Sequence, residues 1–200
     1  AVMWRSRYGR RTFDLERGIR VQLTGKLTLY PARGAFQMDV VSFAEAGEGK
    51  LARQFKEVVE RLEAEGLTAP DRKRPIPFLP RRVGVVTSAT GAALRDILKV
   101  LSRRFPVPVL LSHSPVQGED APAKLTSALE RLGRVQDVDV VILGRGGGSA
   151  EDLAAFNDEK LARRVASHPV PIISAVGHEV DVAVTDLVAE DGSLVIAAKV

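Results

Sequence analysis

The sequence contains no cysteine, no apolar run long enough to cross a membrane, and no recognisable signal peptide. The lack of cysteine excludes disulfide bonds and thiolate metal sites and is typical of a cytoplasmic protein. A membrane-spanning helix needs roughly 20 apolar residues in succession, and no stretch approaches that length. Hydrophobic residues make up 45% of the 200 residues and charged residues 27%, as in globular chains. We therefore expect a cytoplasmic protein with no membrane partner.

The formal net charge of +4 is unevenly distributed along the chain. Residues 1–82 hold 17 Lys/Arg and 10 Asp/Glu, a balance of +7, whereas residues 83–200 hold 12 and 15, a balance of −3. This asymmetry favours a basic front half that meets a polyanion, with a different role for the second half. The alternative is ordinary surface charge.

The front of the chain shows the period of two that is typical of β-strands. Apolar residues alternate over residues 19–29 and again over residues 35–41, with a turn between them. Gly25 falls within the first alternation, which indicates a bulge or a bend. By its alternation Phe36 belongs to the core. The pattern predicts antiparallel β structure.

A change of period follows. Residues 50–66 carry a helical stripe of apolar residues, and Gly66 is a plausible end for that helix. Residues 68–82, with four prolines and five basic residues, are typical of a linker. Short apolar strands then alternate with helices, which predicts a parallel sheet covered on both faces. The predicted strands lie at 82–87, 107–113, 138–143 and 171–176.

Three of these strands end in polar loops, at residues 87–91, 144–149 and 177–181. Parallel strands share a direction, so we expect the three loops to lie on one edge of the sheet, where such sheets bind ligands. Hydroxyl groups and the backbone N–H groups of glycines could hold a phosphate there. The predicted phosphate-binding residues are Ser88, Thr90, Gly91, Gly146, Gly147, Gly148 and Ser149.

The glycine loop "GRGGGS" matches neither GxxxxGK[ST] nor GxGxxG, which disfavours nucleoside triphosphate and dinucleotide binding. Its single charge, Arg145, offers a planar fork for phosphate oxygens. In the loop "GHEVD", His178 could transfer a proton and Asp181 could fix its tautomer. These groups together suit phosphodiester cleavage.

Three alternatives remain open at this point. Carboxylates near the loops could hold a hard cation. A hydrolase could instead use Ser149 or Ser174 as a nucleophile with His178, although neither serine stands in a GxSxG motif. The chain could also be a non-catalytic module that binds single-stranded DNA. The carboxylates in question are Asp96, Glu151, Asp152, Glu179 and Asp181.

Four segments resemble the large-subunit family of bacterial exodeoxyribonuclease VII, over roughly residues 20–189. They read "TGAALRDILKVLSRRFP", "VQGEDAPAKL", "GRGGGSAEDLAAFNDE" and "PIISAVGHEVDVAVTDLVA". The resemblance implies a hydrolase that degrades single-stranded DNA to short oligonucleotides, in complex with several copies of a small subunit. The resemblance also implies that this hydrolase requires no divalent metal or other cofactor, although Mg²⁺ could bind. The family's essential residues match Asp96, Arg145, His178 and Asp181.

The resemblance also assigns the fold and the domains. It implies a partial antiparallel OB-fold at 1–48 that binds single-stranded DNA, a helix and linker at 49–82, and a Rossmann-like α/β nuclease domain at 83–190. Residues 191–200 resemble a fragment of a C-terminal β region, with a coiled coil and the first OB strands missing from the printed sequence. Aromatic and basic residues at the front fit DNA binding independently. The predicted DNA-binding residues are Trp4, Arg5, Arg7, Tyr8, Arg10 and Arg11.

Overall fold

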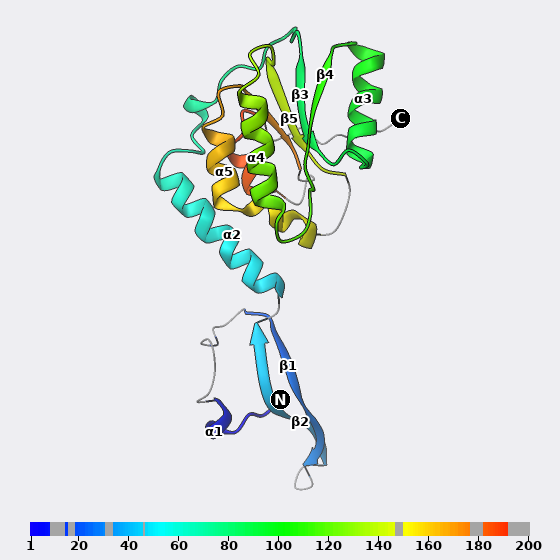
Figure 1. Cartoon of the computed structure of the whole chain (residues 1–200). Helices are drawn as coiled ribbons and strands as arrows, with labels where there is room; N and C mark the ends of the chain where they lie inside the picture. Colours follow the sequence, from blue (N-terminus) through cyan, green and yellow to red (C-terminus); the bar gives the residue numbers. More distant parts are fainter. Residues whose placement is uncertain are drawn as a thin grey trace. The chain divides into compact units, whose positions relative to one another are not determined.

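The chain forms two compact units, Ala1–Gln54 and Phe55–Val200, and Figure 1 shows the elements of each. The computed structural model describes residues 1–8, 15, 19–30, 34–45, 47–146, 150–176 and 182–191.

The first unit contains a short helix, α1 (Arg5–Tyr8), and an antiparallel pair of strands, β1 (Val21–Tyr30) and β2 (Ala35–Glu45). The pairing register shifts at Gly25, which confirms the predicted irregularity. A Cβ atom at Gly25 would lie 2.4 Å from the carbonyl oxygen of Asp39, so only glycine fits this close approach.

One face of this hairpin is apolar and open. Leu27 pairs with Met38 and Leu29 pairs with Phe36 across the two strands. The side chain of Phe36 is 76% exposed and that of Leu27 is 74% exposed, so the prediction that Phe36 is a core residue is wrong. Two strands supply only one layer, and an apolar strand face is buried only when a second layer packs on it.

Helix α2 (Gly47–Ala64) confirms the helix predicted over 50–66. Gly66 has a φ of +71°, and its N–H donates to the Glu63 carbonyl while the N–H of Leu67 donates to the Leu62 carbonyl. This pair of bonds is the Schellman motif, which satisfies the last carbonyls of a helix and needs a left-handed residue such as glycine. Gly66 therefore ends α2, as predicted.

The second unit is built on a parallel four-stranded sheet in the order β4-β3-β5-β6. Its strands are β3 (Val83–Thr87), β4 (Val109–His113), β5 (Val140–Gly144) and β6 (Ile172–Ala175). Its helices are η2 (Pro70–Arg72), α3 (Ala92–Arg104), α4 (Ala121–Gly133), η3 (Ala150–Asn157), α5 (Glu159–Ala166) and α6 (Val184–Val188). In the described part of the chain, no helix is both long enough and apolar enough to span a membrane.

Alternate strand residues face opposite layers of this unit. Val83 and Val85 of β3 pack with Ile97 of α3, whereas Val86 packs into the larger core with α4 and α5. Figure 1 shows α4 and α5 together and α3 apart from them. Helices therefore cover both faces of the parallel sheet, as the sequence predicts.

The predicted linker is irregular apart from η2, but two of its cations, Arg72 and Arg74, are bound within the unit. Arg72 donates to the carbonyl oxygens of Leu67, Val188 and Ala166, and Arg74 forms an ion pair with Glu190 at 2.5 Å. These side chains hold the segment against the fold, so the basic charge of the front half is not all available to a polyanion.

The C-terminal β region predicted at 191–200 lies almost wholly outside the described residues. Asp191 forms an isolated parallel bridge with Ile173 of β6, and its carbonyl oxygen accepts a hydrogen bond from the Ser174 N–H at 2.8 Å.

Candidate functional site

The strand order creates one position at which the connections diverge. The chain leaves β3 toward β4 at one side of the sheet, and after β4 it returns to β5 on the other side of β3. Open parallel sheets bind ligands outside the carboxyl ends of the strands at such a point. The expected site therefore lies where β3 and β5 end.

A cavity of about 350 Å³ occupies this position. Its walls come from the segments that follow β3, β5 and β4. The lining residues are Ser88, Gly91, Ala92, Pro115, Val116, Gln117, Arg145 and Gly146. The structure thus brings Arg145 together with three predicted phosphate-binding residues. The sequence did not predict that the residues after β4 would line this site, although "VQGEDAPAKL" is among the segments that carry the family resemblance.

The loop after β3 is fixed from two sides. The N–H of Gly91 donates to the carbonyl oxygen of Ser88 at 3.2 Å, and the Ser88 and Thr90 hydroxyl oxygens lie 3.4 Å apart. From β4, the Nδ1 atom of His113 accepts a hydrogen bond from the Ala89 N–H at 3.0 Å. His113 was not a predicted site residue, because no local pattern reveals a bond between side chain and backbone across strands.

Gly146 lies against the beginning of α3. A Cβ atom there would stand 3.7 Å from both the Cβ atom of Ala92 and the backbone nitrogen of Ala93. The Nε–H of Arg145 donates to the carbonyl oxygen of Gly146 at 2.9 Å. The site therefore combines a guanidinium group with a helix N-terminus, and both favour an anion.

The structure does not place the other three predicted catalytic residues, Asp96, His178 and Asp181, in the lining of this cavity. Asp96 is half-buried in the second turn of α3 and does not line the cavity. His178, Asp181, Gly147, Gly148 and Ser149 lie outside the described residues. Among the residues that are described, no three His, Asp or Glu side chains gather in a way that could hold a metal ion.

A buried polar network joins β6 to the start of α6. Ser174 Oγ donates to Asp186 Oδ1 at 2.5 Å, and the N–H of Ala183 donates to Asp186 Oδ2 at 2.9 Å. Ser174 is fully buried and committed to this network, so the alternative in which it acts as a nucleophile is wrong. Asp186 links β6 to the start of α6.

The other described histidine has a structural role. His168 is 2% exposed, and its ring nitrogens lie 2.8 Å from the Val170 carbonyl oxygen and 3.0 Å from that of Leu129. Burial lowers the pKa of His168 below its ordinary value.

The predicted DNA-binding residues of the first unit differ in availability. Trp4 is 64% exposed, and Arg5 is exposed beside it. Arg7 Nη1 donates to Asp39 Oδ1 at 3.2 Å, and Tyr8 stacks on Phe43 with a centroid separation of 6.1 Å. Arg10 and Arg11 lie outside the described residues.

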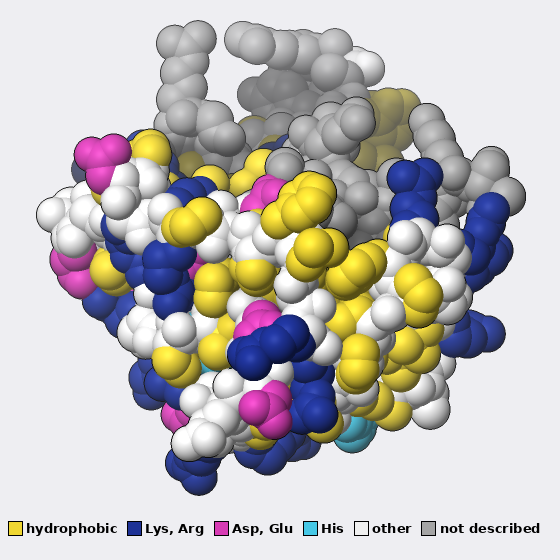
Figure 2. All heavy atoms as spheres, turned by 90° about the horizontal axis from the view of Figure 1, so that it is seen from above, with side chains coloured by type: hydrophobic (Ala, Val, Ile, Leu, Met, Phe, Trp, Pro, Cys, Tyr) yellow, Lys and Arg dark blue, Asp and Glu magenta, His cyan; other side chains and the backbone are white. Residues whose placement is uncertain are grey.

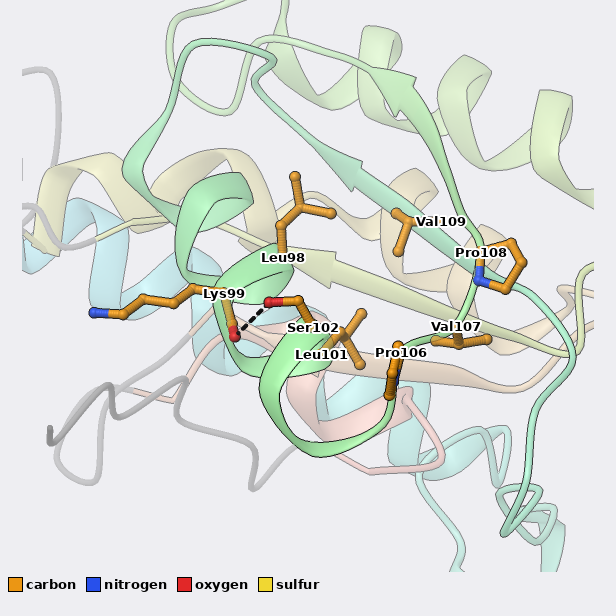
Figure 3. A pocket seen from close by; sticks show the side chains of 8 residues that line it. All are labelled: Leu98, Lys99, Leu101, Ser102, Pro106, Val107, Pro108 and Val109. Carbon is orange, nitrogen blue, oxygen red and sulfur yellow. Dashed lines mark hydrogen bonds between the residues drawn. The ribbon is translucent and has the colours of Figure 1, made fainter.

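A second cavity, of about 600 Å³, lies between α3 and the segment that leads into β4 (Figure 3). Leucine, proline and valine side chains form most of its lining, and the Lys99 side chain extends away from it. Apolar side chains also lie among charged ones on the face seen in Figure 2, so an apolar surface does not by itself mark a ligand site. Among the described residues, Lys99 is the one charged residue of this lining, and its side chain leaves the cavity, so the cavity itself is a poor phosphate site.

Comparison with protein families gives two matches. The family described as "Exonuclease VII, large subunit" matches residues 67–191, and the family described as "OB-fold nucleic acid binding domain" matches residues 1–43. The second match confirms the predicted OB-fold at the front of the chain.

Curated proteins named exodeoxyribonuclease 7 large subunit are similar over most of the chain. That of Moorella thermoacetica is 50% identical over 190 residues, which are 94% of this chain and 47% of the relative. That of Hahella chejuensis is 52% identical over 174 residues, 86% of this chain and 39% of the relative. The chain spans about half the length of the curated relatives it matches or somewhat less. It belongs to the exonuclease VII large-subunit family.

Proposed function

We propose that this chain is the catalytic part of an exonuclease that hydrolyses phosphodiester bonds of single-stranded DNA to short oligonucleotides. The observation that carries the proposal is the cavity at the ends of β3 and β5, which is lined by Arg145, Ser88 and Ala92, the first residue of α3. Cationic and N–H donors around one cavity suit a phosphoryl group whose charge increases in the transition state. Membership of the exonuclease VII large-subunit family supports the same activity.

In the proposed mechanism, Arg145 stabilises the negative charge on the phosphoryl oxygens. His178 transfers a proton, either from the attacking water or to the leaving oxygen, and Asp181 orients the imidazole. Asp96 is the fourth essential residue, as the family resemblance implies. Ser88, Thr90 and the glycine loop supply donors for the phosphate, and Gly91, whose N–H is bonded to the Ser88 carbonyl oxygen, contributes to the wall of the cavity.

The two units have separate roles in this proposal. Residues 1–48 bind single-stranded DNA, and residues 83–190 form a Rossmann-like domain that cleaves it. Residues 49–82 connect these two parts, and residues 191–200 belong to a C-terminal β region. Exposed Trp4 and Arg5 on the first unit support its role in DNA binding. The subunit acts in the cytoplasm with several copies of the small subunit.

The proposed reaction does not require a metal ion, although Mg²⁺ could bind. The test is to incubate the complete large subunit, assembled with its small subunit, with end-labelled single-stranded DNA in excess EDTA and, in parallel, in Mg²⁺. We expect short labelled products in both conditions and far fewer from a blunt duplex of the same sequence. Cleavage with Mg²⁺ alone would contradict the metal-free mechanism.

The second candidate function is a non-catalytic module that binds single-stranded DNA. The match of residues 1–43 to a nucleic-acid-binding fold is the observation that favours it. Binding without products in either condition would support this function and overturn the nuclease.

A further inference from the structure

Helix α3 carries three cations on its outward face. Arg95, Lys99 and Arg103 follow one another at intervals of four residues, so they stack along one side of the helix, about 6 Å apart along its axis. All three are exposed, whereas Ala93 and Ile97 of the same helix are buried against the sheet.

These cations differ from others in the same unit. Arg61, Arg74, Arg81 and Arg163 each form an ion pair with a carboxylate, at distances between 2.5 and 2.9 Å. By contrast, the side chains of Arg95, Lys99 and Arg103 make no ion pair and no hydrogen bond with any other described residue. Figure 3 shows the Lys99 side chain extended away from the neighbouring apolar cavity. A row of uncompensated cations raises the local potential and attracts a polyanion.

The row begins beside the candidate site. Ala92, the first residue of α3, lines the cavity that contains Arg145, and Arg95 stands one turn further along the helix. A strand whose phosphate occupies that cavity has further phosphates on each side of it. The cations are about 6 Å apart along the helix axis. Successive phosphates of a stacked strand are about 3.4 Å apart, so each cation can contact a separate phosphate.

We propose that Arg95, Lys99 and Arg103 form a phosphate track, which holds the single strand next to the bond that is cleaved. The inference rests on the proposed function for the identity of the polyanion. It adds a contact surface on the second unit to the one proposed for the OB-fold unit.

The test compares two double variants with the same change in charge, in the complete large subunit. Lys99→Gln with Arg103→Gln removes part of the phosphate track. Lys160→Gln with Arg134→Gln removes one lysine and one arginine that are also exposed and make no side-chain ion pair among the described residues. The measurement is the affinity for a phosphorothioate-linked single strand, which keeps its charge and resists cleavage, at several salt concentrations.

We expect the slope of log affinity against log salt to be shallower by about 1.4 in the track variant, at about 0.7 for each phosphate contact with a single strand. The control variant should keep the parent slope. Equal slopes in the two variants would overturn the proposal, and loss of small-subunit binding with an unchanged slope would assign the row to a protein contact instead. If the parent large subunit cleaves no DNA but the track variant still has the shallower slope, the nuclease is refuted and the phosphate track is retained.

Discussion

The imidazole of His113, at the end of β4, accepts a hydrogen bond from the Ala89 N–H, in the loop after β3, at 3.0 Å. The acceptor is Nδ1, so the bond requires that this nitrogen carries no proton. His113 thereby supports the segment that contributes Ser88 and Gly91 to the candidate site.

Two substitutions of His113 should separate this bond from the bulk of the side chain. His113→Asn keeps an acceptor near the position of Nδ1, whereas His113→Gln places its amide further out. A net hydrogen bond contributes about 1 kcal/mol, so we expect kcat/KM for single-stranded DNA to fall about fivefold in the Gln variant. The Asn variant should stay close to the parent. Similar losses in both variants would contradict a role through Nδ1.

Arg145→Ala should abolish most of the cleavage without abolishing DNA binding. Loss of one donor to a developing charge costs about 100- to 1,000-fold in kcat, which is the range we expect. The measurement is single-turnover cleavage at saturating DNA, with affinity determined separately. Reduced affinity with an unchanged single-turnover rate would show that Arg145 only anchors the substrate.

Trp4→Ala should weaken the binding of single-stranded DNA by about 1–3 kcal/mol if the exposed indole stacks on a base. Trp4→Phe keeps an aromatic face and should recover most of the affinity. Fluorescence anisotropy with a labelled strand measures both. An affinity unchanged in the Ala variant would exclude Trp4 from the interface.

Asp186→Ala should destabilise the second unit. It leaves the Ala183 N–H buried without its acceptor, whereas the Ser174 hydroxyl keeps Thr185 Oγ1, at 3.2 Å, as a partner. An unsatisfied buried donor costs about 1–3 kcal/mol, and urea denaturation followed by circular dichroism should show a loss in that range. The matched control is Asp120→Ala, since the Asp120–Lys124 ion pair at 3.3 Å is exposed and should contribute less than about 1 kcal/mol. Equal losses would show that the buried network has no special role.

The buried His168 makes stability depend on pH. Its lowered pKa means that the unfolded chain binds a proton more readily than the folded chain, so its contribution is complete above about pH 6.5 and is lost as the pH falls below that. We expect the denaturation midpoint to decline between about pH 7.5 and 5.5, and to decline less in His168→Gln. Identical pH profiles in the parent and in His168→Gln would contradict the assignment to His168.

Periodicity and strand direction allow much of this fold to be predicted. The alternation of strands and helices after residue 82 arises from local apolar spacing, and Gly66 ends α2 because a left-handed position is needed there. The parallel direction of the strands then predicts that Ser88 and Arg145 share one edge, and both line the cavity.

The errors concern interactions between distant segments. Alternation shows that Phe36 belongs to an apolar face, but whether that face is covered depends on another layer. The linker sequence does not reveal that Arg72 and Arg74 bind carbonyl oxygens and a carboxylate roughly a hundred residues away. The bond from Ala89 to His113 is likewise set by the strand order.

The ion pair between Arg74 and Glu190 closes the second unit at the beginning of β6, where Glu190 also accepts a hydrogen bond from the Ile172 N–H. The candidate site lies at the opposite end of the strands. The ion pair between Arg74 and Glu190 is therefore separate from the residues that line the candidate site. Local opening at the carboxyl edge of the sheet need not break this ion pair or proceed to global unfolding.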